Sequence, residues 1–133
     1  MAEAFQLSVV APDKTIVDEV TESVIAPGLN GYFGVHSGHE PFVTQLRPGV
    51  VTYKDAGGAE QRVAISGGFA EVSADHVILL ADSAERQSDI DVSRAENAAE
   101  RARNRLADRT AGIDAARAQA ALERAENRLR LGR

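Results

Sequence analysis

The amino-acid sequence predicts an α+β fold, in which an N-terminal antiparallel β-sandwich is followed by a C-terminal two-helix antiparallel hairpin. Short apolar and β-branched runs, separated by Gly, Pro and Asp, fill the first two thirds of the chain. A stretch rich in Ala, Glu and Arg fills the last third and is typical of helices. We expect the β-sandwich head to cover 1–86 and the helical hairpin to cover 87–133.

The strands are predicted from period-two alternation and from turn residues. Phe5, Leu7 and Val9 alternate with polar side chains, as in a strand with one buried face. Two hairpins are expected further on, with turns at Asp55–Gly58 and at Ser73–Asp75. Many short strands at this spacing indicate an antiparallel sandwich or barrel.

The C-terminal part predicts two helices, at about 91–107 and 113–131, with a break at Thr110–Gly112. Ser88 or Asp91 is expected to cap the first helix. The apolar faces are Ala95, Ala98, Ala102 and Leu106 on the first helix, and Ala118, Leu122, Ala125 and Leu129 on the second. Because alanine buries little area, the hairpin should hold together weakly. A moving part and a permanently docked hairpin both remain open.

Composition narrows the class of protein. The 133 residues include no cysteine, and no apolar run approaches the roughly 20 residues that span a bilayer. The N-terminus lacks the basic and apolar regions of a secretory signal. These features favour a soluble cytoplasmic protein. Residues 1–83 carry four basic and eleven acidic side chains, whereas residues 84–133 carry eleven arginines and nine acids, which suggests two parts with different partners.

No catalytic constellation is evident. The run His36–Glu40 contains two histidines and a carboxylate, but it lacks the helical spacing of a metal site, and Gly38 and Pro41 predict a loop, so no metal is expected. Ser66–Gly68 lacks the G-x-S-x-G pattern of a nucleophile elbow and is expected to form a close-packed turn between strands. No phosphate-binding P-loop is present.

The tail arginines allow two interpretations. Arg94, Arg101 and Arg105 share one helical face, and Arg117, Arg124 and Arg128 repeat that spacing. Such faces can bind phosphates or an acidic protein surface. They can also be solvated faces paired with Glu96, Glu100, Glu123 and Glu126, and the residues alone favour this second interpretation.

Two other classes of protein are weighed against the sequence. A nucleic-acid-binding module would use the arginine faces, but the net charge of −5 and the absence of aromatic residues in the tail argue against it. A small hydrolase or metal enzyme of sandwich fold would need a nucleophile–base pair, which is not apparent.

Four motifs, in order along the chain, resemble those of the epsilon subunits of bacterial F-type ATP synthases. They are Gly31–Pro41 for G-x-x-G-h-x-x-G-H-x-P, Ser66–Val72 for S-G-G-F-x-E-V, Val77–Glu85 for the final strand with its A-x-x-A-E ending, and Asp89–Ala95 for I-D-x-x-R-A. Ser37 departs from the pattern, because members often have Pro or Ala there. The resemblance covers essentially the whole chain.

The resemblance implies a non-catalytic regulatory and coupling subunit of the central stalk. The head would bind the gamma subunit and the rotor c-ring, and the Gly31–Pro41 loop is expected to bring Tyr32, Phe33, His39 and Phe42 together there. The tail would inhibit ATP hydrolysis by extending among the catalytic alpha and beta subunits. The arginines expected to contact them are Arg101, Arg103, Arg105, Arg124 and Arg128. The subunit would be peripheral at the cytoplasmic face of the bacterial cell membrane, reaching the membrane only through the complex and binding no nucleic acid.

The resemblance also implies that the compact tail binds ATP as a regulatory ligand, with no cofactor required. The implied ATP-binding residues are Glu85, Ile90, Asp91, Arg94, Ala95, Arg124 and Arg128. Arg124 and Arg128 would bond phosphate oxygens, Asp91 would bond ribose or adenine, and Ala95 would leave room for the ring. Glu85 and Ile90 would offer backbone groups to the base. The alternative is that Asp91 only caps a helix and the arginines pair with Glu123 and Glu126.

Overall fold

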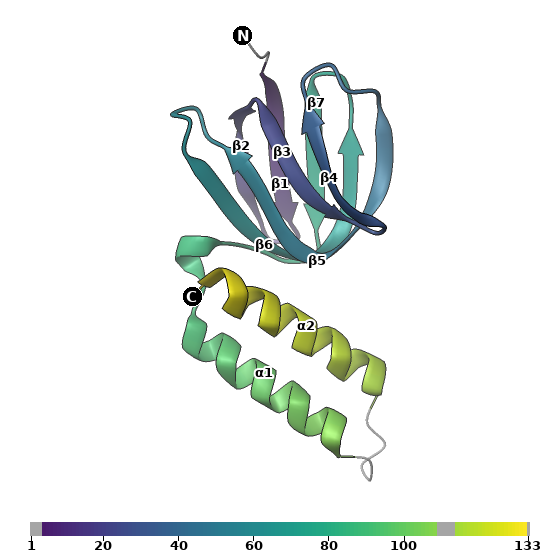
Figure 1. Ribbon diagram of the computed structural model, residues 1–133, viewed down its shortest axis with the longest axis vertical. Coiled ribbons are helices and arrows are strands. Elements are labelled where there is room, and N and C mark those ends of the chain that lie inside the picture. Colours follow the sequence, from purple (N-terminus) through teal and green to yellow (C-terminus); the bar gives the residue numbers. More distant parts are fainter. Residues whose placement is uncertain (1–3, 109–113, 133) are drawn as a thin grey trace. The chain divides into compact units, whose positions relative to one another are not determined.

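The computed structural model describes residues 4–108 and 114–132 and divides the chain into two compact units. The β unit is Met1–Gln87 and the helical unit is Ser88–Arg133, one residue from the expected boundary (Figure 1).

The β unit is one eight-stranded sheet that folds into a sandwich, as predicted (Figure 1). The strands are β1 (Phe5–Ala11), β2 (Lys14–Thr21), β3 (Ser23–Gly28), β4 (Gly31–His36), β5 (Phe42–Lys54), β6 (Glu60–Val72), β7 (His76–Ala81) and β8 (Ala84–Arg86). Their order is β2-β1-β7-β6-β5-β3-β4, with β8 pairing with β6. The β1–β7 pair is parallel and the other described pairs are antiparallel. A hairpin forces antiparallel pairing only on neighbours in sequence, and β1 and β7 are not neighbours.

The two long strands β5 and β6 pair with each other from one end to the other. Residues 63–65 of β6 pair with β8, and residues 68–72 pair with β7. The change of partner falls at Gly67 and Gly68, whose φ angles are 117° and 134°. A Cβ on Gly68 would collide with the carbonyl oxygen of Leu80. The expected turn at Ser66–Gly68 is therefore wrong in detail, since this segment is an irregular point within one strand.

The core of the β unit follows the predicted alternation. Phe5, Leu7 and Val9 are buried, and Tyr53 is the largest fully buried side chain, at 1% exposed. Both predicted hairpins are confirmed, because β5 pairs with β6 up to Lys54–Glu60 and β6 pairs with β7 up to Val72–Val77.

The segment Gly31–Pro41 is only partly the loop that the sequence predicted. Gly31–His36 forms strand β4, which pairs with β3 from Gly28–Gly31 to Ser23–His36. Gly31 has a φ of 132°, which lets the chain reverse as the strand begins. Only residues 37–41 remain outside the strands.

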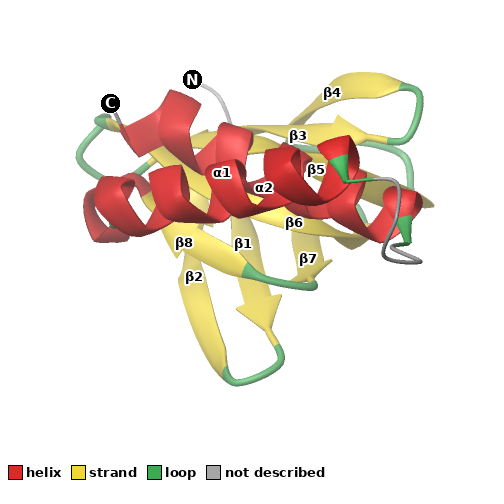
Figure 2. Cartoon of the chain, turned by 90° about the horizontal axis from the view of Figure 1, so that it is seen from below, coloured by secondary structure: helices red, strands yellow, loops and turns green. Residues whose placement is uncertain are grey.

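The helical unit contains a short 3-10 helix η1 (Gln87–Asp89), α1 (Val92–Ala107) and α2 (Ala115–Gly132). The two helices lie side by side (Figure 2). The Asp91 carboxylate accepts a hydrogen bond from the Arg94 amide at 3.0 Å, so Asp91 rather than Ser88 caps α1. The expected break at Thr110–Gly112 lies outside the described residues. Within the described part of the chain, no helix is both long and apolar enough to cross a bilayer.

The hairpin core is small and consists mostly of alanine, as expected. It comprises Ala95, Ala99, Ala125 and Leu129, with Val92, Ala98 and Leu122 packed against them. Ala99 was absent from the predicted face, where half-buried Ala98 stood in its place. The shift is one residue along the helix, or about 100° around its axis.

Candidate functional site

Six of the seven residues implied for ATP binding lie in the helical unit, whereas Glu85 belongs to β8 of the β unit. A Cβ on Gly132 would lie 2.8 Å from Ile90 Cγ2 and 3.1 Å from Val92 Cγ2. The end of α2 therefore packs beside the start of α1, where Ile90, Asp91 and Arg94 are found. The hairpin thus brings four of the implied residues, Arg128 included, to one end of the helical pair.

The implied residues differ in how exposed their side chains are and in the hydrogen bonds that they already make. Ala95 is 2% exposed and packs in the hairpin core, so in this conformation it has no open surface for a nucleotide ring. The Asp91 carboxylate already accepts a hydrogen bond from the backbone amide of Arg94. Arg94 is exposed, while Arg124 and Arg128 are half-buried and one turn apart on α2. The guanidinium groups are therefore the polar side chains best placed to meet an anion here.

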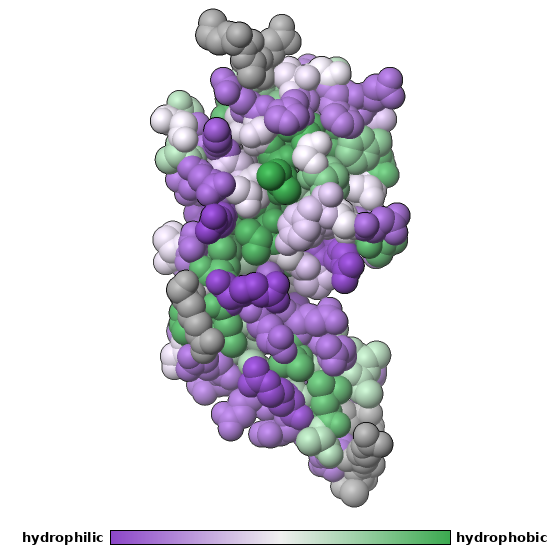
Figure 3. All heavy atoms as spheres, in the orientation of Figure 1, coloured by the Kyte–Doolittle hydropathy of each residue, from purple (hydrophilic) through white to green (hydrophobic). Residues whose placement is uncertain are grey.

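The tail arginines expected to meet the catalytic subunits are distributed over both helices. Arg101, Arg103 and Arg105 on α1 are exposed. Hydrophilic side chains cover much of the visible surface of the two helices (Figure 3). A cationic surface on α1 is thus available to a partner of opposite charge.

The aromatic cluster expected around Gly31–Pro41 forms in part. The rings of Phe33 and Phe42 meet edge to face with centroids 5.5 Å apart, and His39 lies 5.4 Å from Phe42. Tyr32 does not join them, because neighbouring residues of a strand point to opposite faces. Its hydroxyl instead accepts a hydrogen bond from the Val50 amide at 3.0 Å.

The same segment offers little as a metal site. The Nδ1 of His39 lies 3.1 Å from the backbone oxygen of Glu40. Across residues 4–108 and 114–132, the structure gathers no three His, Cys, Asp or Glu side chains that could hold a metal ion.

Sequence reasoning missed an exposed apolar row on the β unit. Val43, Phe69 and Leu80 are 71%, 56% and 52% exposed, and Phe69 pairs directly with Leu80 across β6 and β7. Their strand neighbours, such as Ala70 and Leu79, are buried. Strict alternation would have assigned the three to the outer face, but it does not distinguish a solvated face from one that binds a partner.

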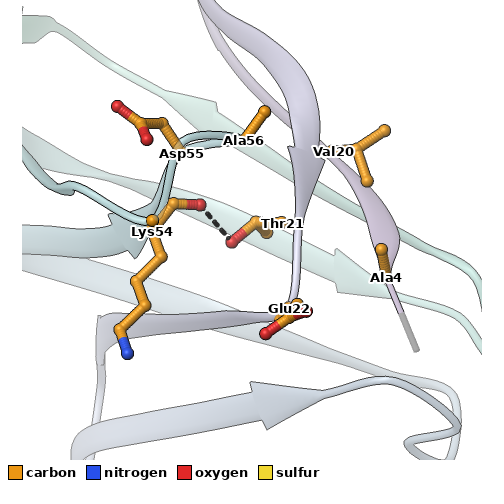
Figure 4. Close-up of a pocket in the computed structure, with 8 residues that line it drawn as sticks. Ala4, Val20, Thr21, Glu22, Lys54, Asp55 and Ala56 are labelled. Atoms are coloured by element: carbon orange, nitrogen blue, oxygen red, sulfur yellow. Dashed lines mark hydrogen bonds between the residues drawn. The ribbon is translucent and has the colours of Figure 1, made fainter. Parts of the chain in front are cut away.

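A second missed feature is a pocket of about 280 Å³ on the β unit (Figure 4). It is lined by Ala4, Val20, Thr21, Glu22, Lys54, Asp55, Ala56 and Gly58. The Thr21 hydroxyl donates to the backbone oxygen of Lys54 at 2.7 Å and is 3% exposed (Figure 4). Because it is engaged with the backbone and mostly buried, Thr21 serves the fold rather than acting as a nucleophile.

A third missed feature is Arg86, at the end of β8. Its guanidinium donates to the Tyr53 hydroxyl at 3.2 Å and to the Ile16 backbone oxygen at 2.8 Å. Burial raises the pKa of the Tyr53 phenol, and the neighbouring Arg86 opposes that rise. No sequence pattern marks this pair, because its members come from strands far apart in the chain.

Comparisons with known proteins cover both units. Residues 4–87 match the family described as ATP synthase, Delta/Epsilon chain, beta-sandwich domain, and residues 88–131 match the corresponding long alpha-helix domain. A relative named ATP synthase epsilon chain, from Desulfosudis oleivorans, is 51% identical over 106 residues, covering 80% of each chain. One of the same name from Moorella thermoacetica is 49% identical over 103 residues, covering 77% of each chain.

Solved structures agree with these matches. A chain in the cryo-EM structure of Euglena gracilis mitochondrial ATP synthase, OSCP/F1/c-ring in rotational state 1, has a TM-score of 0.80 and 29% identity, covering 92% of this chain and 78% of that one. A chain of the Tetrahymena thermophila mitochondrial ATP synthase central stalk/c-ring has a TM-score of 0.56 and 10% identity, covering 98% and 95%, and supports the fold alone. The chain therefore belongs to the ATP synthase delta/epsilon chain family, and the expectation of a non-catalytic ATP synthase subunit is confirmed.

Proposed function

We propose that this chain is the regulatory and coupling subunit of a bacterial ATP synthase rotor. In this proposal the β unit binds the gamma subunit and the c-ring, at the cytoplasmic face of the cell membrane. The helical unit inhibits ATP hydrolysis in an extended form and binds regulatory ATP in a compact form. The observation that carries the proposal is the contrast between two compact units, one with a large apolar core and one held mainly by alanine.

The exposed row of Val43, Phe69 and Leu80 supports a partner on the β unit. The three side chains present apolar surface on adjacent strands, and burying such surface drives protein association. A large protein partner such as gamma suits an exposed sheet face of this kind better than a small ligand, which needs a concave site.

The small core of the helical unit supports a conformational change. Ala95, Ala99 and Ala125 each bury one methyl group in it, and each such group contributes about 0.8 kcal/mol. Alanine also has the highest helix propensity, so the helices can persist when their mutual contacts are lost. An extended form that inserts among alpha and beta subunits is therefore accessible at modest cost.

ATP binding is proposed for the end of the hairpin where α1 begins. Arg94 and Arg128 supply guanidinium groups at this end, where Ile90 and Asp91 are also found, and Arg124 lies one turn before Arg128 on α2. In this arrangement Ala95 acts as a small spacer within the core rather than as a contact to the ring. A ligand that binds only the compact form stabilises it by RT ln(1 + [L]/Kd), which is about 2.7 kcal/mol at a hundredfold excess over Kd.

Calorimetry on the full chain tests the ATP model. Arg94→Ala and Arg128→Ala should each weaken ATP binding about 10- to 100-fold, because each removes a charge-assisted hydrogen bond worth about 1.5–3 kcal/mol. Arg130→Ala is the matched control, since Arg130 is exposed and lies two residues from Arg128, on a different side of α2. Equal losses in all three variants, or no binding at millimolar ATP, would remove the ATP site from the proposal.

Truncation tests whether the β unit binds the partners and the helical unit inhibits hydrolysis. A chain that ends at Asp89 keeps every strand of the β unit and should still assemble with gamma and the c-ring. The reconstituted complex should then hydrolyse ATP faster than one with the full chain. Failure of the folded truncated chain to assemble would place partner binding in the helices instead. Unchanged hydrolysis under all nucleotide and proton-gradient conditions would remove inhibition from the proposal.

A further inference from the structure

Strand β8 is short for its position at the end of the β unit. Only its three residues, Ala84–Arg86, pair with β6, at Val63–Ile65. The beginning of the segment has extra support, because the Ser83 hydroxyl donates to Ser66 Oγ at 2.7 Å and the Ser66 amide donates to the Ser83 oxygen at 3.1 Å. A three-residue strand makes few ladder bonds, so its far end depends on other contacts.

The Arg86 side chain supplies those contacts, and its first partner is a β-bulge in β2. Val9 pairs with Val17, and Val10 pairs with Thr15, so Ile16 is the extra residue that the β1–β2 ladder leaves out. A bulged residue needs a partner for its backbone oxygen from outside the ladder. The Nη2 of Arg86 donates to that oxygen at 2.8 Å.

The second partner of Arg86 is Tyr53, a member of the sandwich core near the end of β5. Tyr53 belongs to β5 and is 1% exposed, and its hydroxyl accepts a hydrogen bond from Arg86 Nη1 at 3.2 Å. A buried hydroxyl without a partner is costly, so the phenol and the guanidinium satisfy each other. One side chain thereby connects β8 with both β2 and β5.

We propose that Arg86 is a positioning residue that fastens the last strand and fixes the point where the chain leaves the β unit. Beyond it, η1 spans Gln87–Asp89 and contains no buried residue, and the cap of α1 follows at Asp91. A change in the path of the tail then starts at residue 87 and leaves the pairing of β8 with β6 intact. The fastening rests on contacts within the β unit, while its use in regulation rests on the proposed function.

Hydrogen exchange on the full chain tests the fastening. In Arg86→Gln, the amides of residues 84–87 should exchange about tenfold faster or more, because two bonds from a charged donor are lost. The amides of β1 and β7 should keep their wild-type rates. Arg86→Lys should recover part of the protection, since one ammonium group retains the charge but lacks the planar fork that reaches two oxygens in different directions.

Tyr53→Phe tests the same fastening with the arginine in place. It should raise exchange in β8 by a smaller factor, because the bond to Ile16 remains. Trypsin should also cleave after Arg86 several-fold faster in this variant, with cleavage after Arg62 unchanged. Tyr32→Phe is the matched control, since it removes a phenol bonded to a backbone amide of β5 and should leave β8 unaffected.

Two results would overturn the inference. One is that the β8 amides exchange at the wild-type rate in both Arg86→Gln and Tyr53→Phe. The other is an equal rise in β1, β7 and β8, which would mean that Arg86 only stabilises the β unit as a whole. If Arg86→Gln does not fold, Tyr53→Phe still decides between these outcomes. Loss of ATP binding or of inhibition in other variants leaves the fastening intact, so the two proposals fail separately.

Discussion

Leu129→Ala is the substitution that most directly tests the weak core of the helical unit. Leu129 is 8% exposed and is the only buried member of that core larger than alanine. Truncating a buried leucine costs about 2–5 kcal/mol, and the lower end applies because a small core collapses easily around the gap. A loss of about 2 kcal/mol shifts the balance between packed and separated helices about 30-fold.

Hydrogen exchange of α1 and α2 measures this shift residue by residue. Leu129→Ala should speed exchange in both helices, while the β unit keeps its rates and its urea midpoint. Gln119→Ala is the control, since Gln119 is exposed on the same helix. In the reconstituted complex, Leu129→Ala should also require more ATP to relieve inhibition. Unchanged exchange in α1 would refute the claim that Leu129 helps to hold the two helices together.

Three further predictions concern single positions. Gly68→Ala should destabilise the β unit by about 3 kcal/mol or more in urea unfolding, because its φ is 134° and its Cβ would collide with the Leu80 oxygen. Asp91→Ala should lower the helical circular dichroism signal and cost the helical unit about 1 kcal/mol, since the N-cap bond is lost. Hydrogen bonds, first that from Gln61, lower the pKa of Asp55 in the folded protein. The stability that the Asp55 carboxylate contributes is therefore present above its ordinary pKa of 3.8 and is lost as pH falls through the lower folded pKa. The difference in stability between wild type and Asp55→Asn should therefore shrink in strong acid, and a constant difference would contradict this.

Features that depend on nearby residues could be predicted from the sequence. The alternation at Phe5–Val9, the turn at Asp55–Gly58 and the cap at Asp91 are each set within a few residues of chain. The segment Gly31–His36 was misread because its glycines suggested a loop. Pairing with β3, a tertiary contact, makes it a strand.

Features that depend on distant residues could not be predicted. Arg86, Ile16 and Tyr53 meet only because three strands converge, and no local pattern records that. The parallel β1–β7 pair likewise joins strands that are far apart in the chain. Within the implied ATP site, the shared helical face of Arg124 and Arg128 follows from their spacing, whereas the burial of Ala95 depends on how the two helices pack.

We expect the two units to differ in stability because they bury different kinds of side chain. The β unit buries Tyr53, Leu7, Ile65 and Leu79, and each large apolar side chain contributes about 1.5–3 kcal/mol. The helical unit buries mainly methyl groups, yet alanine favours the helix itself. A perturbation of a few kcal/mol therefore separates the helices before it melts them, and long before it opens the sandwich. The proposed function, in which the tail changes conformation while the β unit holds its partners, requires this order of events.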